Sequence, residues 1–393
     1  MRFIVAAFLI YLGMHAYAFV ALGAAFAPGA PAAAGLAAAM ALLAFAPVFA
    51  HVLDRRGAAV AGRALARAGY LWMGLLFLFV CWGLALDLVA AAAALVRGAG
   101  AAALPDPDAH ARALAALALT AASALYGAFE ARRVRVRRVS VRSARLPAGH
   151  PPVRVVQITD LHIGPMTGAG PVRRLATRLA ALEPDLLVST GDLIDGDIPC
   201  AQAAAQALAA VPARLGRFAV IGNHEVYAGL EAAAAATRWA GFVLLRDEWR
   251  AVGDGLVVAG VDDPAAGGPD REARVFDGLP AGRCTLLLKH RPRVRPASLG
   301  RFDVQLSGHT HRGQIFPFGW VVRRAYPARP GLTDLGSGSY LYLSNGTGFW
   351  GPPIRFLAPP EIAVIELVPA AQAPAPDGRS PGDGPGPGAG GDA

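Results

Sequence analysis

Five short polar motifs stand directly after apolar stretches of this chain. Each contains Asp, Asn or His, whose side chains are possible metal ligands. The first is Asp160-Leu161-His162, which follows the apolar run 153–158 and offers a carboxylate and an imidazole two residues apart. The others are Gly191-Asp192, Gly222-Asn223-His224-Glu225, Lys289-His290 and Gly308-His309-Thr310-His311. Short runs of aliphatic and β-branched residues are typical of buried strands, so each motif is expected at the C-terminal end of a strand. Asp-x-His alone is common by chance, but packing does not explain five such strand ends.

The candidate ligands have the chemistry that hydrolysis of a phosphate ester requires. They are Asp160, His162, Asp192, Asn223, His290, His309 and His311. The reaction needs water that is deprotonated near neutral pH and positive charge beside the phosphoryl oxygens. Two metal ions about 3.5–4 Å apart supply both, with a hydroxide held between them. Mixed nitrogen and oxygen ligands suit Mn, Fe, Zn or Co, so two divalent ions of this group are the predicted cofactors.

An α/β domain is expected to position these residues. Strands alternate with helices at first and then follow one another, which predicts two mixed sheets with helices outside, a four-layer αββα sandwich. The domain is placed at 132–368. The stretch 369–393 is Pro/Gly-rich with almost nothing to bury, and is predicted to be a disordered tail. Strands are expected at 153–158, 185–189, 218–221, 242–245, 256–261, 284–289, 303–306, 341–344 and 362–367, and helices at 170–182, 200–210 and 229–240.

The first 131 residues are predicted to be a bundle of four transmembrane helices. The chain is 54% hydrophobic and only 17% charged, and its mean hydropathy is +0.41, which is too apolar for a soluble protein of this length. A helix needs about 20 apolar residues to cross a bilayer. Four stretches are assigned as crossings, at about 3–27, 32–53, 69–96 and 112–130.

Charges between the crossings predict the orientation of the domain. Arg2, the loop 54–67 and the stretch after 130 are basic, whereas 28–31 is uncharged and 98–110 carries two aspartates. The positive-inside rule therefore places the domain on the cytoplasmic side of the inner membrane. Ala25-Phe26-Ala27 resembles a signal-peptide cleavage site, but cleavage there leaves the domain on the same basic side.

Basicity alone does not indicate nucleic acid as a partner. The formal charge is +9 and the sequence pI about 10.1, yet Lys289 is the only lysine, so the excess reflects an Ala/Arg-biased composition as well as it reflects function. The segment 132–142 alternates Val with Arg directly after a membrane helix, and its basic face is expected to meet anionic headgroups. Membrane lipid is the expected partner, and nucleic acid is not. The cysteines Cys81, Cys200 and Cys284 are scattered and imply neither a disulfide framework nor a structural zinc site.

The order of the five motifs resembles the calcineurin-like metallophosphoesterase superfamily over roughly 150–368. The resemblance implies that one metal is held by Asp160, His162 and His311, and the other by Asn223, His290 and His309. Asp192 would bridge the two ions. His224 would approach the leaving-group oxygen as an acid or transition-state stabiliser, and Glu225 is expected to orient His224.

Differences from other branches of that superfamily limit which phosphoesterase reaction is expected. Gly196 stands where the similar Ser/Thr protein phosphatases have an arginine that clamps the phosphoryl group, which argues against protein phosphatase activity. The runs 308–315 and 359–362 resemble the membrane-associated bacterial branch, which includes enzymes similar to UDP-2,3-diacylglucosamine pyrophosphatase. Arg312 departs from that branch, where glycine is usual. Arg291 and Arg312 flank ligands and are either phosphate contacts or ordinary surface arginines.

The sequence therefore predicts a membrane-anchored, dimetal phosphodiesterase or pyrophosphatase. A domain held at the membrane above a layer of arginines favours a phosphate-ester substrate that is itself linked to a lipid. Two alternatives remain: a catalytically silent membrane sensor or scaffold of the same fold, and a nuclease, although no groove with interleaved aromatic residues is evident.

Overall fold

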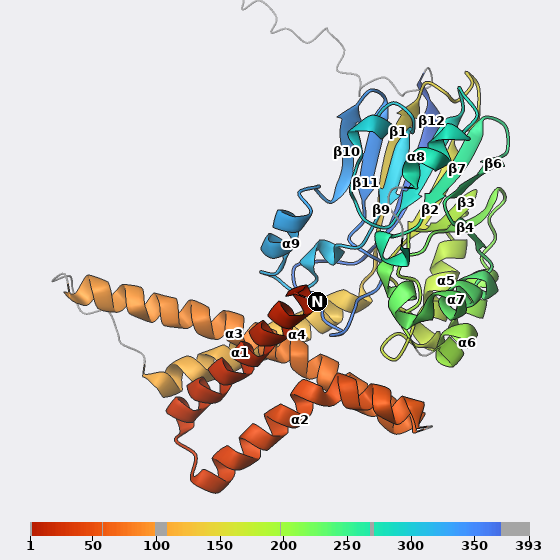
Figure 1. Ribbon diagram of the computed structural model, residues 1–393. Coiled ribbons are helices and arrows are strands. Elements are labelled where there is room, and N and C mark those ends of the chain that lie inside the picture. The colour runs from red at the N-terminus through yellow and green to blue at the C-terminus, as the bar shows by residue number, and fades with distance from the viewer. Residues whose placement is uncertain (1, 57, 99–107, 197, 268–270, 371–393) are drawn as a thin grey trace, which may run out of the picture.

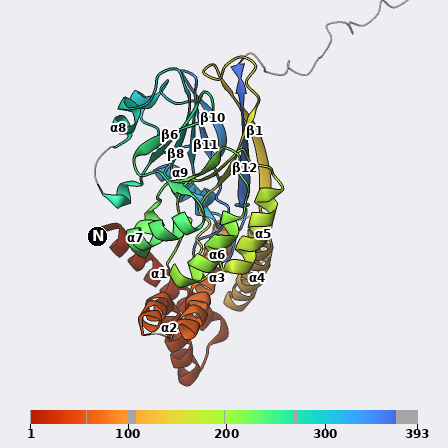
Figure 2. The same cartoon turned by 90° about the vertical axis from the view of Figure 1, so that its right-hand side faces the viewer.

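Four long apolar helices form the N-terminal part of the protein. The computed structural model describes residues 2–56, 58–98, 108–196, 198–267 and 271–370. The helices are α1 (Arg2–Phe26), α2 (Ala30–Arg55), α3 (Ala59–Gly98) and α4 (Ala109–Arg132), and each is long and apolar enough to cross a membrane. Figure 2 shows them gathered at one end of the molecule, below the sheets. Large side chains such as Ile10, Leu88 and Leu125 are 66–74% exposed on them, as expected for surfaces that face lipid.

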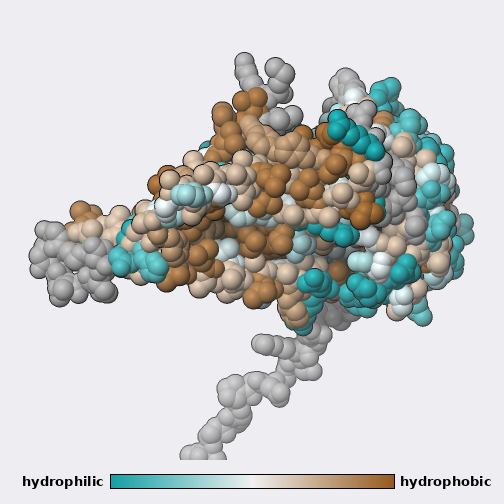
Figure 3. All heavy atoms as spheres, turned by 90° about the horizontal axis from the view of Figure 1, so that it is seen from below, coloured by the Kyte–Doolittle hydropathy of each residue, from teal (hydrophilic) through white to brown (hydrophobic). Residues whose placement is uncertain are grey.

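The apolar surface of the molecule follows the same division. In Figure 3 the brown, hydrophobic atoms spread over the helical part, whereas teal atoms gather on the α/β domain. The prediction of four N-terminal helices that are long and apolar enough to cross a membrane is therefore confirmed.

Helix α3 is longer than the sequence predicted. The basic loop expected at 54–67 is mostly helical, because α2 continues to Arg55 and α3 begins at Ala59, so that Arg63 and Arg67 lie on α3. Alanine and arginine are both strong helix formers, and a charged stretch built from them does not interrupt a helix. At about 1.5 Å per residue, the 40 residues of α3 exceed the hydrocarbon thickness roughly twofold, so one end of α3 extends beyond it.

The rest of the described chain forms two six-stranded mixed sheets. The first has the order β1-β12-β2-β3-β4-β5 and the second the order β10-β11-β9-β8-β7-β6. The strands of the first are β1 (Arg135–Ser143), β12 (Glu361–Pro369), β2 (Val153–Ile158), β3 (Leu186–Ser189), β4 (Gly216–Ala219) and β5 (Val243–Leu244). The strands of the second are β10 (Gly331–Gly336), β11 (Ser339–Leu343), β9 (Val304–Ser307), β8 (Cys284–Lys289), β7 (Leu256–Val261) and β6 (Glu248–Val252).

Alternation of side chains along the strands builds a four-layer sandwich. Val155 and Val188 of the first sheet and Leu286 and Leu306 of the second belong to one buried cluster between the sheets. The opposite faces carry helices: α5 (Ala169–Ala180), α6 (Ile198–Ala209) and α7 (Asn223–Trp239) pack on the first sheet, and α8 (Glu272–Asp277) packs on the second. Figure 1 shows α5, α6 and α7 grouped at one side of the domain. The predicted αββα class with two mixed sheets is confirmed.

Some elements were not expected from the sequence. They are the helices α8 and α9 (Gly319–Ala325) and the strands β6 and β10. The basic segment after α4 is β1, which pairs in parallel with β12 at the edge of the first sheet. The predicted disordered tail falls almost wholly on 371–393, which lies outside the described residues; Pro369 ends β12.

The loop between β11 and β12 joins the α/β domain to the membrane helices. Ile354 packs with Leu78 of α3 and Ile315 in a small buried cluster. The Arg355 backbone N–H donates to the Gly127 carbonyl of α4 at 2.9 Å. A Cβ at Gly127 would lie 2.5 Å from Ile354 Cγ2, so only glycine permits this approach.

A bulkier residue at Gly127 is expected to loosen this contact. Gly127→Leu forces the loop away from α4 and should cost about 1–3 kcal/mol, as overpacking does elsewhere. Thermal unfolding of the detergent-purified protein should show a lower melting temperature. Gly13→Leu, on α1 where nothing lies within 4 Å, is the matched control. Equal melting temperatures for the two variants would contradict the contact.

Candidate metal centre

The five motifs all lie at the C-terminal ends of neighbouring parallel strands. Asp160 and His162 follow β2, Asp192 follows β3, and Asn223 begins α7 just after β4. In the second sheet, His290 follows β8, and His309 and His311 follow β9. The strands β2, β3 and β4 pair in parallel, as do β8 and β9, so their ends meet at one edge of the sandwich. Residues that are up to 151 positions apart in the chain are thereby brought together.

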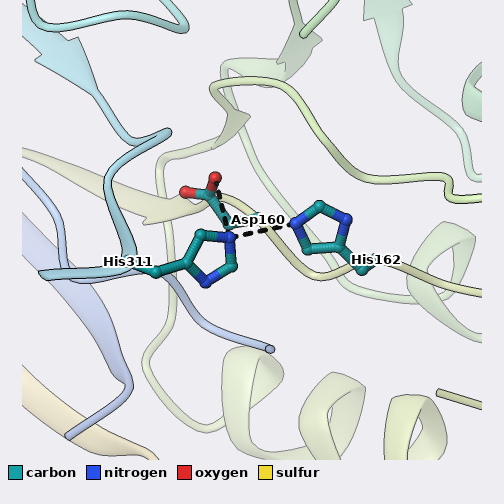
Figure 4. A group of neighbouring side chains, drawn as sticks. All are labelled: Asp160, His162 and His311. Atoms are coloured by element: carbon teal, nitrogen blue, oxygen red, sulfur yellow. Dashed lines mark hydrogen bonds and ion pairs between the residues drawn. The ribbon is translucent and has the colours of Figure 1, made fainter. Parts of the chain in front are cut away.

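The first cluster consists of Asp160, His162 and His311 (Figure 4). His162 Nε2 lies 3.0 Å from His311 Nε2, which in turn lies 3.4 Å from Asp160 Oδ1. All three residues are buried. Figure 4 shows the two imidazoles and the carboxylate converging on one point. Burial lowers the pKa of His311, and the Arg355 guanidinium lowers it further, so this imidazole is neutral and has a lone pair for a metal.

The second cluster consists of Asp192, His290 and His309. His290 Nε2 lies 3.1 Å from Asp192 Oδ2 and 3.1 Å from His309 Nδ1. The outer nitrogens have their own partners, because His290 Nδ1 donates to the Thr190 carbonyl at 2.9 Å and His309 Nε2 lies 2.9 Å from the Tyr326 hydroxyl. Such outer contacts fix the tautomers and aim the inner nitrogens at the cluster.

The two histidines of this second cluster have pKa values shifted in opposite directions. Burial lowers the pKa of His309 to about 3, and the charge of His290 acts in the same direction. Burial alone would also lower the pKa of His290, but the charge and hydrogen bond of Asp192 raise it to about 10. A proton on His290 therefore neutralises Asp192 in the protein alone, and a metal ion would replace that proton.

Asn223 supplies a further sign that a cation fits here. Its Oδ1 is buried and accepts no hydrogen bond from any residue that the structure describes. A buried carbonyl oxygen left in this way is unfavourable unless another group coordinates it. Asn223 lies beside Asp192, because the backbone N–H of His224 donates to Asp192 Oδ1 at 2.8 Å. The donor set of carboxylate, carboxamide and imidazole groups thus fits divalent metal ions.

Backbone strain is concentrated at the same residues. Twelve described residues other than glycine have positive φ. Five of these are candidate ligands: Asp160, His162, Asp192, His309 and His311, with φ between 46° and 73°. A non-glycine residue pays a steric cost in this conformation, and such outliers persist where the surrounding structure fixes them for a function.

His224 is held next to both clusters by a residue that the sequence analysis did not assign. Its Nδ1 lies 2.9 Å from Asp195 Oδ1, and its ring meets that of His162 edge to face at 4.6 Å between centroids. Burial lowers the pKa of His224, but the hydrogen bond to Asp195 and the charge of Asp192 raise it above its ordinary value overall. The imidazole is therefore prepared to carry a proton.

Glu225 does not orient His224, contrary to the expectation from the sequence. Its buried carboxylate accepts the backbone N–H groups of Asp192, Leu193, Ile194 and Gly222, at 2.6–3.0 Å. It therefore fixes the loop that carries Asp192 onto the first turn of α7. The motif position of Glu225 was visible in the sequence, but which atoms it contacts depends on how β3 and β4 are paired.

Two arginines near the ligands have different partners: one pairs with a carboxylate and the other with backbone carbonyls. Arg291 forms a bidentate pair with Asp263, with distances of 2.7 and 2.9 Å. Arg355 is completely buried, and its guanidinium donates to the carbonyls of His311, Asn345 and Gly348 at 2.9 Å each. Arg355 stands in no recognisable motif, and its only signal in the sequence is a single charge within an apolar stretch.

Comparisons with known proteins agree with this geometry. Residues 153–313 match the family model described as "Calcineurin-like phosphoesterase". An uncharacterized metallophosphoesterase of Aquifex aeolicus is 34% identical over 250 residues, covering 62% of this chain and 95% of that protein. A relative in Bacillus subtilis, also named an uncharacterized metallophosphoesterase, is 32% identical and is covered over 83% of its length.

The name of a vertebrate relative describes a transmembrane protein. The "Transmembrane protein with metallophosphoesterase domain" of Danio rerio is 30% identical over 63% of this chain and 61% of that protein. The two-sheet sandwich and the buried Asp and His clusters at its strand ends agree with these matches. This chain belongs to the calcineurin-like phosphoesterase family, and it is a membrane protein.

Replacing the Glu225 carboxylate should disturb the metal centre through the loop. In Glu225→Gln the amide nitrogen faces backbone N–H groups, and each N–H left without an acceptor costs about 1–3 kcal/mol. We expect a lower melting temperature and weaker binding of Mn²⁺, measured by titration of the purified protein. Glu248→Gln, which alters an ion pair with Arg250 at the surface, should change neither. Unchanged Mn²⁺ affinity in Glu225→Gln would show that the loop does not depend on this carboxylate.

Proposed function

We propose that the protein is a membrane-anchored hydrolase that cleaves phosphodiester or pyrophosphate bonds with two divalent metal ions of the Mn, Fe, Zn or Co group. The observation that carries the proposal is the pair of ligand groups, Asp160/His162/His311 and Asp192/His290/His309. Within each group the possible ligand atoms lie within 4.8 Å of one another. Membership of the calcineurin-like phosphoesterase family supports the same reaction class.

The geometry supports a specific assignment of ligands. Asp160, His162 and His311 would hold the first ion, and Asn223, His290 and His309 the second. Asp192 would hold both, because its Oδ2 lies 3.1 Å from His290 Nε2 and 3.9 Å from His162 Nε2, between the two clusters. Such ions would offset the charge of the phosphoryl oxygens and lower the pKa of a bound water.

His224 is the proposed catalytic acid. Its Nδ1 faces Asp195, which leaves Nε2 to give a proton to the leaving oxygen or to stabilise charge there. The carboxylate of Asp195 would orient the imidazole and stabilise its protonated form, in the way that an aspartate supports a catalytic histidine in other hydrolases.

Access from the membrane favours a substrate linked to a lipid. A cavity of about 200 Å³ lies between the membrane helices and the metal centre. Its walls include Ala50 of α2 and Tyr70 of α3 on one side, and His162 and Asp195 on the other. The arginine-rich segments that flank the helices favour a cytoplasmic domain at the inner membrane. An amphiphile in that leaflet would then have a direct path to the site.

Loss of the His224 imidazole should separate an enzyme from a silent scaffold. His224→Ala is expected to reduce hydrolysis of bis(4-nitrophenyl) phosphate by about 10²–10⁴-fold while bound metal is retained, because the acid is lost but the ligands remain. His150→Ala, which removes a histidine outside the site, is the control. An inactive wild-type protein with full metal content would instead support the scaffold alternative.

Substrate presentation tests the lipid link. The Mn-loaded protein should hydrolyse a lipid diphosphate, such as UDP-diacylglucosamine, in mixed micelles faster than a short soluble diester, because the lipid is concentrated in the plane of the membrane helices. Rates should be compared at equal bulk concentration with and without micelles. Equal rates for the two substrates, regardless of micelles, would contradict a lipid-linked substrate.

A further inference from the structure

An exposed apolar surface begins just after the last ligand motif. Four large side chains between β9 and the end of α9 are 41–60% exposed, and we call them the α9 lip: Phe316, Phe318, Trp320 and Val321. The rings of Phe316 and Trp320 meet edge to face at 5.1 Å between centroids, so two of these side chains form one surface. A cluster of this kind on a protein surface marks a site of contact with a partner or a membrane.

The α9 lip is continuous with the helices that cross the membrane. The ring of Phe318 packs edge to face on Phe77 of α3, with 6.2 Å between centroids. Phe77 lies within the apolar span Val60–Val96. Ile315, directly before the lip, is buried against Leu78 of the same helix. In Figure 1, α9 lies on the side of the domain that faces these helices. The α9 lip is therefore adjacent to the apolar span of α3.

A cavity lies directly behind the lip, and we call it the α9 cavity. Its volume is about 460 Å³. The side chains of Phe316 and Trp320 of the lip line it, as do Leu343 and Phe356. Tyr326 also lines it, and its hydroxyl lies 2.9 Å from His309 Nε2, so the cavity and the second ligand cluster share a wall.

The charge of the α9 cavity is positive. Arg312 and Arg323 line it, and no acidic residue is among its lining residues in the described part of the chain. Arg324, next to Arg323, is also exposed. Arginines at a membrane surface attract acidic lipids, and their aliphatic stems can lie along apolar groups while the guanidinium reaches the headgroups. Tryptophan in turn prefers the interface between headgroups and acyl chains.

We propose that the α9 lip and the α9 cavity form a binding site for an acidic lipid of the surrounding bilayer. The lip contacts the acyl chains, and Arg312 and Arg323 bind the phosphate of the headgroup. This binding needs no turnover and so stands apart from the proposed function. The same site would also deliver a lipid phosphate past Tyr326 to the metal centre. This second step rests on the proposed function.

Quenching of tryptophan fluorescence by brominated lipids tests the site. The full chain is reconstituted into phosphatidylcholine vesicles that contain an equal fraction of brominated phosphatidylcholine or of brominated phosphatidylglycerol. We expect stronger quenching by the acidic lipid, since the two arginines should enrich it at the site by on the order of tenfold. In Trp320→Phe this preference should be lost. In Trp239→Phe, which removes a 45% exposed tryptophan of α7, it should remain.

A charge variant provides the second arm. Arg323→Gln should reduce the preference for the acidic lipid, whereas Arg301→Gln, which alters an exposed arginine paired with Asp277, should leave it unchanged. Equal quenching of the wild-type protein by both lipids would overturn the proposal, as would a preference that persists in Trp320→Phe. Hydrolysis is not measured in either arm, so an inactive protein with the expected quenching would refute the proposed function and leave the lipid site standing.

Discussion

The burial of two carboxylates among four imidazoles is the constraint on which the rest of this structure depends. Asp160 and Asp192 are at most 2% exposed, and burying a carboxylate is costly unless a cation or hydrogen-bond donors compensate for it. Burial raises the pKa of Asp160. For Asp192, burial acts in the same direction, but the charge and hydrogen bond of His290, together with the charges of His162 and His224, lower the pKa overall. A cluster in which imidazole nitrogens, an amide oxygen that accepts no hydrogen bond from the described residues, and carboxylate oxygens converge is stabilised well by metal cations.

The candidate ligands are held in position by residues that are not ligands themselves. Glu225 binds the turn after β3, and Arg355 binds the carbonyls around His311. Arg355 also joins the metal centre to the membrane part, because its backbone contacts α4 at Gly127 while its guanidinium contacts His311. The helix α4 thus contacts a residue that supports the ligand loop around His311.

Much of the fold could be predicted from the sequence because each strand is a short apolar run and each motif follows one. The alternation of strands and helices indicated two sheets, and the apolar stretches indicated four crossings. The first turns of α3 are not recognisable as part of an apolar crossing because they contain Arg63 and Arg67, yet arginine favours helix and the helix continues through them. The helix α9 was missed because its seven residues are too short for a periodic pattern.

The candidate ligands were recognisable from residue types and their order, and the structure places them at one edge of the sandwich. Their supporting contacts were not recognisable in the same way. Asp195 and Glu225 are both carboxylates close to the motifs, and only the pairing of β3 with β4 decides that Asp195 meets His224 while Glu225 meets the backbone. Tyr326 and Arg355 lie in segments without a motif, and their contacts arise from long-range packing that local sequence does not encode.

Anomalous X-ray diffraction from crystals of the Mn-loaded full-length protein tests the central claim most directly. We expect two peaks, one surrounded by Asp160, His162 and His311 and the other by Asn223, His290 and His309. Asp192 should contact both. A single peak, or peaks that lie away from Asp192, would contradict the account.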